Sequence, residues 1–274
     1  MLYTHYSVDL DAACSIWAAR TFLDRTDPIQ FVPANWNGDE LSEFDLALDI
    51  EAGLKGEKLP DGRILSCFSS LVAANATEED QEALVDLLRF VDLQDSSGDP
   101  YANLGEGSTL SPEDHKMLKS CGLNSVLMAL KRIYDRDDEA IVNAFGDILD
   151  GLYESSLSLV RAQTEAANAI VVDSVVAICD NNREFSTNGV VFETTGVKAI
   201  VYIDGYNLGV VRSGSFTGTI FGDNAKALVG DEDGWFIHSA GFLAARGSRK
   251  SEATSPSRVN PRDLAEAVAK DVLN

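Results

Sequence analysis

The sequence predicts an α/β protein that consists of a doubly wound, mostly parallel sheet domain, a helical connector and a smaller C-terminal α/β domain. Over the first part of the chain, short apolar runs alternate with stretches of helical periodicity, as expected of strands buried between helices. Beyond Glu184 the sequence changes to short β-rich runs separated by Gly, Asn and Ser. We therefore expect three parts, at residues 1–110, 111–182 and 183–274.

Length and charge limit the functions that the chain can have. It has 274 residues, of which 45% are hydrophobic, so it can build more than one core. Its 22 Lys and Arg residues face 44 Asp and Glu residues, which gives a net charge of −22. This charge opposes the binding of duplex DNA or of an anionic membrane, so we expect neither partner. A phosphate-bearing ligand would need a local basic segment or a bound metal ion.

The compartment and the assembly are predicted from weaker signals. Four cysteines are scattered without CxxC spacing, the N-terminus lacks a signal-peptide pattern, and no long apolar run is present. We therefore expect a reduced, cytoplasmic location without a membrane span. A homodimer is among the assemblies that we expect.

The first domain is predicted to begin with a strand followed directly by a helix. We place the strand at Leu2–Tyr6 and the helix at Asp11–Leu23, where apolar residues recur at helical spacing. Further strands are expected at Ile29–Pro33, Phe44–Ile50 and Arg63–Phe68. A second helix opens at Thr77, a good N-cap followed by acidic residues, and runs through Phe90.

A loop, two long helices and the C-terminal elements follow. Residues 95–112 are rich in Gly, Ser and Pro and are predicted to form a loop. Helices are expected from Pro112 to Tyr134 and from Asp138 to Ala177. The β-rich runs of the last part are VVFETT (190–195), AIVYID (199–204), LGVVRS (208–213) and TGTIFG (217–222). A final helix opens at Asn260-Pro261, since Pro suits a first helical turn.

The strongest functional signal lies where the first strand ends and the first helix begins. There the pattern H-x-x-x-D-x-D-A places His5, Asp9, Asp11 and Ala12 close together. Ligands of open parallel sheets gather at the carboxyl ends of the strands, so an imidazole and two carboxylates here favour a Mn²⁺ or Mg²⁺ site. The alternative is structural, because acidic residues are frequent in this chain. Asp11 would then be a helix-terminus carboxylate and His5 a strand-end residue.

Two later segments offer further carboxylates. Asp49 ends the third apolar run and would lie at the same edge of the sheet, where it could bridge two ions. Its alternative is a strand-end residue that enters a turn. Asp92 and Asp95 follow the predicted second helix, and either could be another ligand. A solvated helix end is the alternative, although carboxylates there oppose the helix dipole.

These residues, in this order, resemble the motifs of the DHH phosphoesterase superfamily, which includes exonucleases, oligoribonucleases, cyclic-dinucleotide phosphodiesterases and pyrophosphatases. The resemblance implies a metal-binding domain and a C-terminal domain of the DHHA1 type, with one or two Mn²⁺ or Mg²⁺ ions as cofactors. It implies that His5, Asp9 and Asp49 hold one ion. It implies that Asp11, Asp49 and a later Asp, taken as Asp95, hold the second. Asp9, Asp11 and Asp49 would be the catalytic residues.

One motif of the family is missing. The family is named for an Asp-His-His triplet after the next strand, and this sequence has Ser66-Cys67-Phe68-Ser69-Ser70 there instead. Cys67 is predicted to be a buried strand cysteine, because Mn²⁺ and Mg²⁺ prefer oxygen and nitrogen ligands. One firm ion site with a weakened second site, and a protein without hydrolytic activity, are both compatible with this departure.

A basic segment near the C-terminus is the remaining candidate. Residues 241–262 contain five Lys and Arg residues against one Glu, in an otherwise acidic chain. Arginine can grip phosphate in a bidentate manner, and glycine permits close approach of the backbone. The resemblance places a substrate loop here, so the predicted substrate-binding residues are His238, Gly241, Arg246, Arg249 and Lys250. A solvated loop whose charges balance the acidic surface is the alternative.

The sequence therefore predicts a metal-dependent phosphoesterase that acts on a small phosphoester, such as a nucleotide or a short single-stranded oligonucleotide. The alternative is a catalytically weakened relative that binds a nucleotide or a phosphorylated partner as a sensor or adaptor. A purely structural protein is disfavoured by the clustering of candidate ligands at strand ends. Kinase and dinucleotide oxidoreductase functions lack support, because neither phosphate-binding glycine pattern is present.

Overall fold

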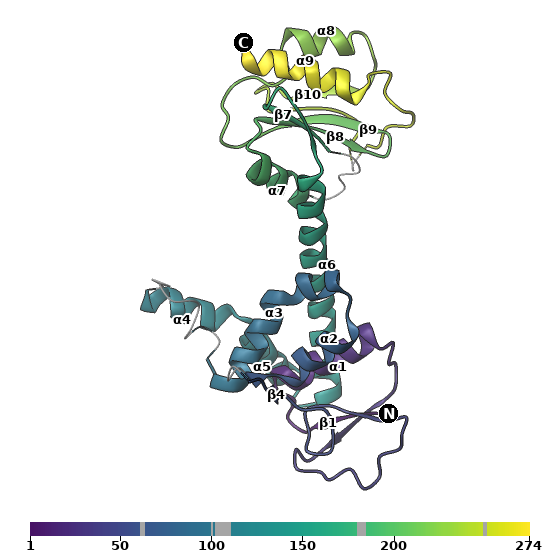
Figure 1. Ribbon diagram of the computed structural model, residues 1–274, viewed down its shortest axis with the longest axis vertical. Helices are drawn as coiled ribbons and strands as arrows, with labels where there is room; N and C mark the ends of the chain where they lie inside the picture. The colour runs from purple at the N-terminus through teal and green to yellow at the C-terminus, as the bar shows by residue number, and fades with distance from the viewer. Residues whose placement is uncertain (61–63, 100, 102–110, 180–184, 249–250) are drawn as a thin grey trace. The chain divides into compact units, whose positions relative to one another are not determined.

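The computed structural model describes residues 1–60, 64–99, 101, 111–179, 185–248 and 251–274. The chain forms two compact units, Met1–Leu157 and Ser158–Asn274, which we call unit 1 and unit 2. Each unit combines helices with a sheet (Figure 1), which confirms the predicted α/β class. The division into three parts remains a prediction. Among the helices of the described residues, none has the length and apolar character needed to cross a bilayer.

Unit 1 contains a three-stranded parallel sheet with the order β2-β1-β3. Its strands are β1 (Leu2–His5), β2 (Ile29–Val32) and β3 (Leu46–Ala47). Leu2 pairs with Ile29 on one side and with Leu46 on the other. Because the strands are parallel, the residues that follow them lie along one edge of the sheet. This edge receives His5 from β1 and Asp49 from the turn after β3.

The helices of unit 1 include α1, which is buried continuously from Leu10 to Ala19. They are α1 (Leu10–Phe22), α2 (Cys67–Asn75), α3 (Glu78–Ser97), α4 (Pro112–Cys121), α5 (Leu123–Ile133) and α6 (Asp138–Ala167), the last of which continues into unit 2. Trp17 of α1, Phe68 of α2 and Phe145 of α6 meet in the core. Each large apolar side chain that is buried in this way stabilises the fold by roughly 1.5–3 kcal/mol. The core thereby fixes the start of α1 relative to the sheet.

The segment after residue 63 differs from its predicted form. The strand expected at Arg63–Phe68 is only β5 (Ile64–Leu65), which pairs antiparallel with β4 (Glu57–Lys58) outside the parallel sheet. Helix α2 begins at Cys67 because Ser66 is its N-cap and accepts a hydrogen bond from Ser69 N. The strand expected at Phe44–Ile50 likewise shortens to β3.

Three helix ends also differ from the prediction. The capping box at Thr77 and Asp80 confirms the start of α3, but the helix continues to Ser97 and places Asp92 and Asp95 inside it. Gly98, at φ 70°, ends the helix in the left-handed conformation. The helix expected from Pro112 to Tyr134 is divided at Gly122, and the helix that begins at Asp138 ends at Ala167.

Unit 2 contains a six-stranded sheet with the order β10-β11-β9-β8-β7-β6. Its strands are β6 (Ile170–Val172), β7 (Val176–Cys179), β8 (Ala199–Asp204), β9 (Asn207–Arg212), β10 (Trp235–Ile237) and β11 (Leu243–Arg246). Among these strands of the described residues, β7 and β8 pair in parallel and the other neighbours are antiparallel. Helices α8 (Asp223–Val229) and α9 (Pro261–Leu273) cover one face and α7 (Phe185–Thr195) covers the other (Figure 1). Successive side chains of a strand point to opposite faces of the sheet, which gives unit 2 a core on each face. Val201 of β8 therefore faces α8 and α9, whereas Ile200 faces α7.

Several predictions for unit 2 are corrected by these elements. The run VVFETT, expected as a strand, belongs to α7, and TGTIFG forms no strand. The residues expected to continue the long helix to Ala177 form β6 and the start of β7. The final helix is confirmed, with Asn260 as its N-cap and Pro261 at its first position.

Candidate metal centre

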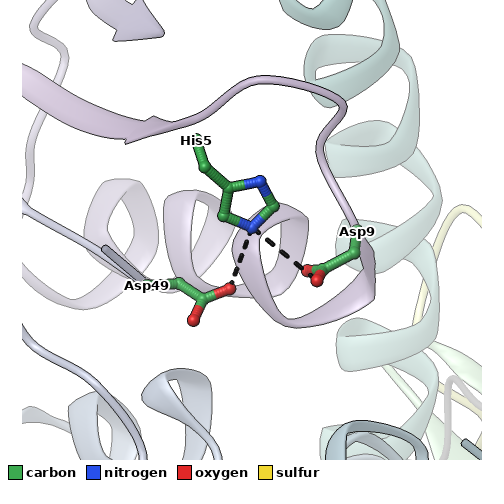
Figure 2. A group of neighbouring side chains, drawn as sticks. All are labelled: His5, Asp9 and Asp49. Carbon is green, nitrogen blue, oxygen red and sulfur yellow. Dashed lines mark hydrogen bonds and ion pairs between the residues drawn. The ribbon is translucent and has the colours of Figure 1, made fainter. Parts of the chain in front are cut away.

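Three side chains converge at the carboxyl-end edge of the parallel sheet (Figure 2). His5 is the last residue of β1, Asp9 is the N-cap of α1, and Asp49 follows β3. His5 Nε2 lies 3.1 Å from Asp49 Oδ2 and 3.7 Å from Asp9 Oδ2. One ligand atom from each residue lies within 4.8 Å of the other two, a spacing that a single cation can bridge. We call these three residues the His5 cluster.

The His5 ring is oriented by the backbone. Its Nδ1 donates a hydrogen bond to the Tyr6 carbonyl oxygen at 2.9 Å, since a carbonyl can only accept. Nε2 is thereby directed at the two carboxylates, in the arrangement that holds a metal-binding imidazole in one tautomer. The hydrogen bond to Asp49, and next the nearby carboxylate of Asp9, raise the pKa of His5 to about 10. A cation that binds Nε2 therefore displaces a proton.

Asp9 serves both the helix and the cluster. Its Oδ1 accepts a hydrogen bond from Ala12 N at 3.0 Å as the N-cap, while its Oδ2 faces His5. Burial acts to raise the pKa of Asp9, but the nearby His5 ring and the hydrogen bond from Ala12 N outweigh it and lower that pKa. The side chain remains 55% exposed, so one carboxylate oxygen is accessible to a cation and its water.

The backbone beside the cluster is in a conformation that few residues adopt. Asp49 has φ 54° and Ser7, between His5 and Asp9, has φ 59°. Left-handed non-glycine residues concentrate at functional sites, where the surrounding structure holds them in place. Around Asp49 that support is a turn, in which Asp49 N donates to Leu54 O at 2.8 Å and Leu54 N donates to Ala47 O at 2.8 Å.

Two residues of later helices hold the loop between His5 and Asp9, and sequence reasoning missed both. Asp138, at the start of α6, accepts hydrogen bonds from Ser7 N at 2.9 Å and Val8 N at 3.2 Å. Lys131 of α5 donates to Ser7 O at 3.2 Å. An acidic residue at a predicted helix start was the only signal at Asp138, and its partner lies 131 residues away.

Asp11, the second residue of α1, packs against the N-terminus of α2, and it is only 3% exposed. Its Oδ2 accepts from Cys67 N at 2.9 Å, and its Oδ1 accepts from Phe68 N at 2.8 Å and from Ser15 Oγ at 3.3 Å. Burial, and next the charge of Asp49, raise the pKa of Asp11 to about 7 against the two backbone hydrogen bonds. Asp11 is therefore within electrostatic reach of Asp49, but it is not one of the three residues that meet.

Asp92 accepts hydrogen bonds from the residues at the start of α2. Its Oδ1 accepts hydrogen bonds from Ser66 N at 2.8 Å, Ser66 Oγ at 2.8 Å and Ser69 Oγ at 2.7 Å. These serines lie in the segment where the resemblance leads one to expect an Asp-His-His triplet. Their S-x-x-S spacing is a signal for an N-cap that sequence reasoning missed.

Asp95, one turn further along α3, is exposed. Burial, and next the charges of Asp49 and Asp9, raise the pKa of Asp95. Asp95 is thus within electrostatic reach of the His5 cluster. Its role as a metal ligand stays a prediction.

Cys67 is buried, as expected, but it lies in a helix rather than a strand. Burial, and next the charge of Asp11, raise the pKa of Cys67 to about 12, so the thiol stays protonated at neutral pH. A protonated thiol is a poor metal ligand. Cys14 and Cys179 are also buried, and Cys121 is exposed.

The donor atoms of the His5 cluster fit a hard or borderline divalent cation. An imidazole nitrogen and carboxylate oxygens suit Mn²⁺, and the oxygens suit Mg²⁺. Two carboxylates also offset the charge of one divalent ion. The predicted ligands His5, Asp9 and Asp49 are brought together, whereas Asp11 lies outside this group.

Two of the predicted substrate-binding residues form a turn in unit 2. Gly241 N donates to His238 O at 2.8 Å between β10 and β11, and Gly241 takes a φ of 66°. His238 Nδ1 accepts from Ala240 N at 3.1 Å, and its ring centroid lies 4.1 Å from that of Phe242. Contact with substrate stays a prediction for both residues.

The predicted basic residues have different surroundings. Arg246 Nη1 donates to Ser255 O at 2.6 Å, and its Nε lies 3.4 Å from Glu232 Oε1. The Arg246 guanidinium therefore has partners within unit 2, and its contact with phosphate stays a prediction. Arg249 and Lys250 lie outside the described residues.

Comparisons with known proteins show a distant structural similarity and no match in sequence. No family model matches the chain, and no curated protein matches it. Among solved structures, the chain is similar to a pGpG-specific phosphodiesterase, PggH, from Vibrio cholerae, with a TM-score of 0.33 and 13% sequence identity. The match covers 89% of this chain and 91% of that chain. At this level of similarity, the geometry of the His5 cluster has to carry any functional conclusion.

Proposed function

We propose that the protein is a metal-dependent phosphoesterase that binds one or two divalent ions, the first of them on His5, Asp9 and Asp49. The observation that supports this proposal is the convergence of one imidazole and two carboxylates within 4.8 Å at the ends of parallel strands. Mn²⁺ is the expected cation and Mg²⁺ the alternative. Asp95 is the proposed oxygen ligand of a second ion.

The residues of the cluster have separate tasks in this proposal. A bound divalent ion would lower the pKa of a coordinated water molecule and would stabilise negative charge on a phosphoryl oxygen. Asp9 and Asp49 bind as carboxylates, and His5 binds through Nε2 after that nitrogen loses its proton. The Tyr6 carbonyl keeps the ring in the required tautomer. Asp138 and Lys131 keep the loop in place.

The proposed substrate is a small phosphoester, such as a nucleotide or a short single-stranded oligonucleotide. The net charge of −22 repels long polyanions, so the metal and a short basic segment have to provide the attraction. We propose that His238, Gly241, Arg246, Arg249 and Lys250 bind phosphate groups, in accordance with the sequence prediction.

A second candidate is a sensor or adaptor that binds a metal ion and a nucleotide without turnover. The start of α2 favours it, because Asp11 is engaged by Cys67 N and Phe68 N rather than by the His5 cluster. The segment also lacks the two histidines that the resemblance leads one to expect.

Turnover assays on the full chain separate these candidates. The purified protein is incubated with Mn²⁺ and bis-p-nitrophenyl phosphate, dinucleotides such as pGpG, or short oligonucleotides. We expect hydrolysis that falls by at least ~100-fold in Asp49→Asn, which loses a ligand. Asp86→Asn is the matched control, since it makes the same change at an exposed position of α3. Mn²⁺ and nucleotide binding without turnover would favour the sensor, and absence of Mn²⁺ binding would overturn both candidates.

A further inference from the structure

Asp9 and Asp11 are two positions apart, yet their carboxylates have different partners. Asp9 is the N-cap of α1 and directs Oδ2 at His5 Nε2, 3.7 Å away. Asp11 is the second residue of the same helix and is buried against the start of α2. The two aspartates of the D-x-D pattern therefore face different structures.

The carboxylate of Asp11 completes the first turn of α2. Backbone N–H groups at the start of a helix have no partner inside that helix. Asp11 accepts from Cys67 N and Phe68 N, Ser66 Oγ accepts from Ser69 N, and Asp92 accepts from Ser66 N. Each N–H from Ser66 to Ser69 thus has an acceptor.

Both oxygens of Asp11 are needed for this arrangement, since Oδ2 serves Cys67 and Oδ1 serves Phe68. Rotation of the carboxylate toward a cation would leave two buried N–H groups without an acceptor, which folded proteins rarely tolerate. Asp11 also has no place in the group of ligand atoms that meet within 4.8 Å among the described residues.

We infer that the centre holds a single divalent ion on His5, Asp9 and Asp49, and that Asp11 is a positioning residue that joins α1 to the start of α2. This inference rests on the proposed metal centre and narrows it to one ion. A one-ion centre can activate water and neutralise charge, whereas a two-ion centre also clamps the attacking and leaving oxygens between ions. The inference therefore also selects the class of mechanism.

The number of ions can be measured without reference to activity. The full chain is stripped with a chelator and titrated with Mn²⁺ by calorimetry, and the bound ion is examined by electron paramagnetic resonance. We expect one ion per chain and the six-line spectrum of isolated Mn²⁺. Two ions per chain, or the exchange-coupled spectrum of ions about 3.5–4 Å apart, would overturn the inference while leaving the proposed metal centre intact.

Variants separate the positioning role from ligation. Asp11→Asn is expected to keep one ion with a Kd within about threefold of the wild type. Its Tm should fall by about 4–8 °C, because the amide NH₂ replaces one of the two acceptor oxygens. Asp49→Asn should lose the ion, and Asp86→Asn should change neither quantity.

The remaining outcomes are also decisive. A loss of bound ion in Asp11→Asn that folds normally would overturn the positioning role. If Asp11→Asn does not fold, the wild-type stoichiometry and spectrum still decide the number of ions. No Mn²⁺ binding by the wild type would overturn the proposed function and this inference together.

Discussion

Unit 1 contains two pairs of carboxylates that differ in the groups facing them. In the His5 cluster, Asp9 and Asp49 each direct an oxygen at one imidazole nitrogen, with side chains 55% and 22% exposed. At the start of α2, Asp11 and Asp92 direct their oxygens at backbone N–H groups and serine hydroxyls. The first pair is open to a cation, whereas the second is already satisfied by the protein. The donors around an aspartate, rather than its spacing in the sequence, therefore determine its role.

The largest expected effect concerns the open pair. His5→Ala removes the nitrogen ligand and leaves Asp9 and Asp49 facing each other without a positive partner. We expect Mn²⁺ affinity to fall by at least ~100-fold, measured by calorimetry on the full chain. Asp86→Asn is the control. An unchanged Kd would show that the His5 cluster is an ordinary ion pair and would remove the contrast with α2.

Substitutions in the second pair, Asp11 and Asp92, should lower the stability of the fold rather than the affinity for Mn²⁺. Asp92→Ala leaves Ser66 N and the hydroxyls of Ser66 and Ser69 without their acceptor. The free energy of unfolding of unit 1 should fall by about 2–3 kcal/mol. Urea unfolding followed by tryptophan fluorescence measures it, with Asp86→Ala as the control. A large change in the number of Mn²⁺ ions bound would contradict the separation of the two pairs.

A smaller effect is expected at the loop that carries the cluster. Asp138→Ala removes the acceptor of Ser7 N and Val8 N but no metal ligand. Mn²⁺ affinity should fall by about 5–20-fold, since the spacing of His5 and Asp9 is less well fixed. Calorimetry measures it, and Asp147→Ala, at an exposed position of the same helix, is the control. Equal Kd values for the two variants would show that Asp138 does not position the cluster.

Unit 2 offers a carboxylate that extends the comparison. Asp271 accepts hydrogen bonds from Gly222 N, Asn224 N, Asn224 Nδ2 and Ala225 N at 2.7–3.0 Å. Burial acts to raise the pKa of Asp271, but these hydrogen bonds outweigh it and lower that pKa. The folded state therefore binds this proton more weakly than the unfolded state does.

The smallest expected effect is the pH dependence that follows. The stabilisation is present above the ordinary Asp pKa and is lost as pH falls through it toward the lower folded pKa. Asp271→Asn should be less stable than the wild type at pH 7 by about 0.5–1 kcal/mol, the cost of losing a helix-cap acceptor at a partly exposed site, with a smaller difference near pH 3. Denaturant unfolding at both pH values measures the difference. A difference that does not narrow in acid would show that the charge of Asp271 is not responsible.

Local sequence patterns predicted that three of the candidate ligands lie close together. His5 and Asp49 were placed at strand ends and Asp9 at the turn before the first helix, and the parallel pairing of β1 with β3 brings them together. Their role as metal ligands stays a prediction. Each of these signals depends on residues that are near one another in the chain. The α/β class followed for the same reason.

The rest depends on contacts between distant segments. Asp11 reaches Cys67 and Phe68 across 56 and 57 residues, which no local pattern displays. The apolar run around Cys67 predicted a strand over Arg63–Phe68, so the S-x-x-S pattern that marks the start of α2 was not recognised. Asp92 and Asp95 were expected beyond the end of a helix that was predicted to stop at Phe90. The sequence contains no breaker before Gly98, so the helix continues and includes both residues.

The burial of three of the four cysteines makes each unit separately observable by thiol labelling. Cys121 is exposed and can react with a maleimide in the folded chain. Cys14 and Cys67 report on unit 1 and Cys179 on unit 2, because each can react only after local opening exposes it. Labelling rates read by mass spectrometry would then give an opening free energy for each half of the chain in one sample, with and without Mn²⁺. A cation held only by the His5 cluster would slow the labelling of Cys14 and Cys67 and leave the rate at Cys179 unchanged.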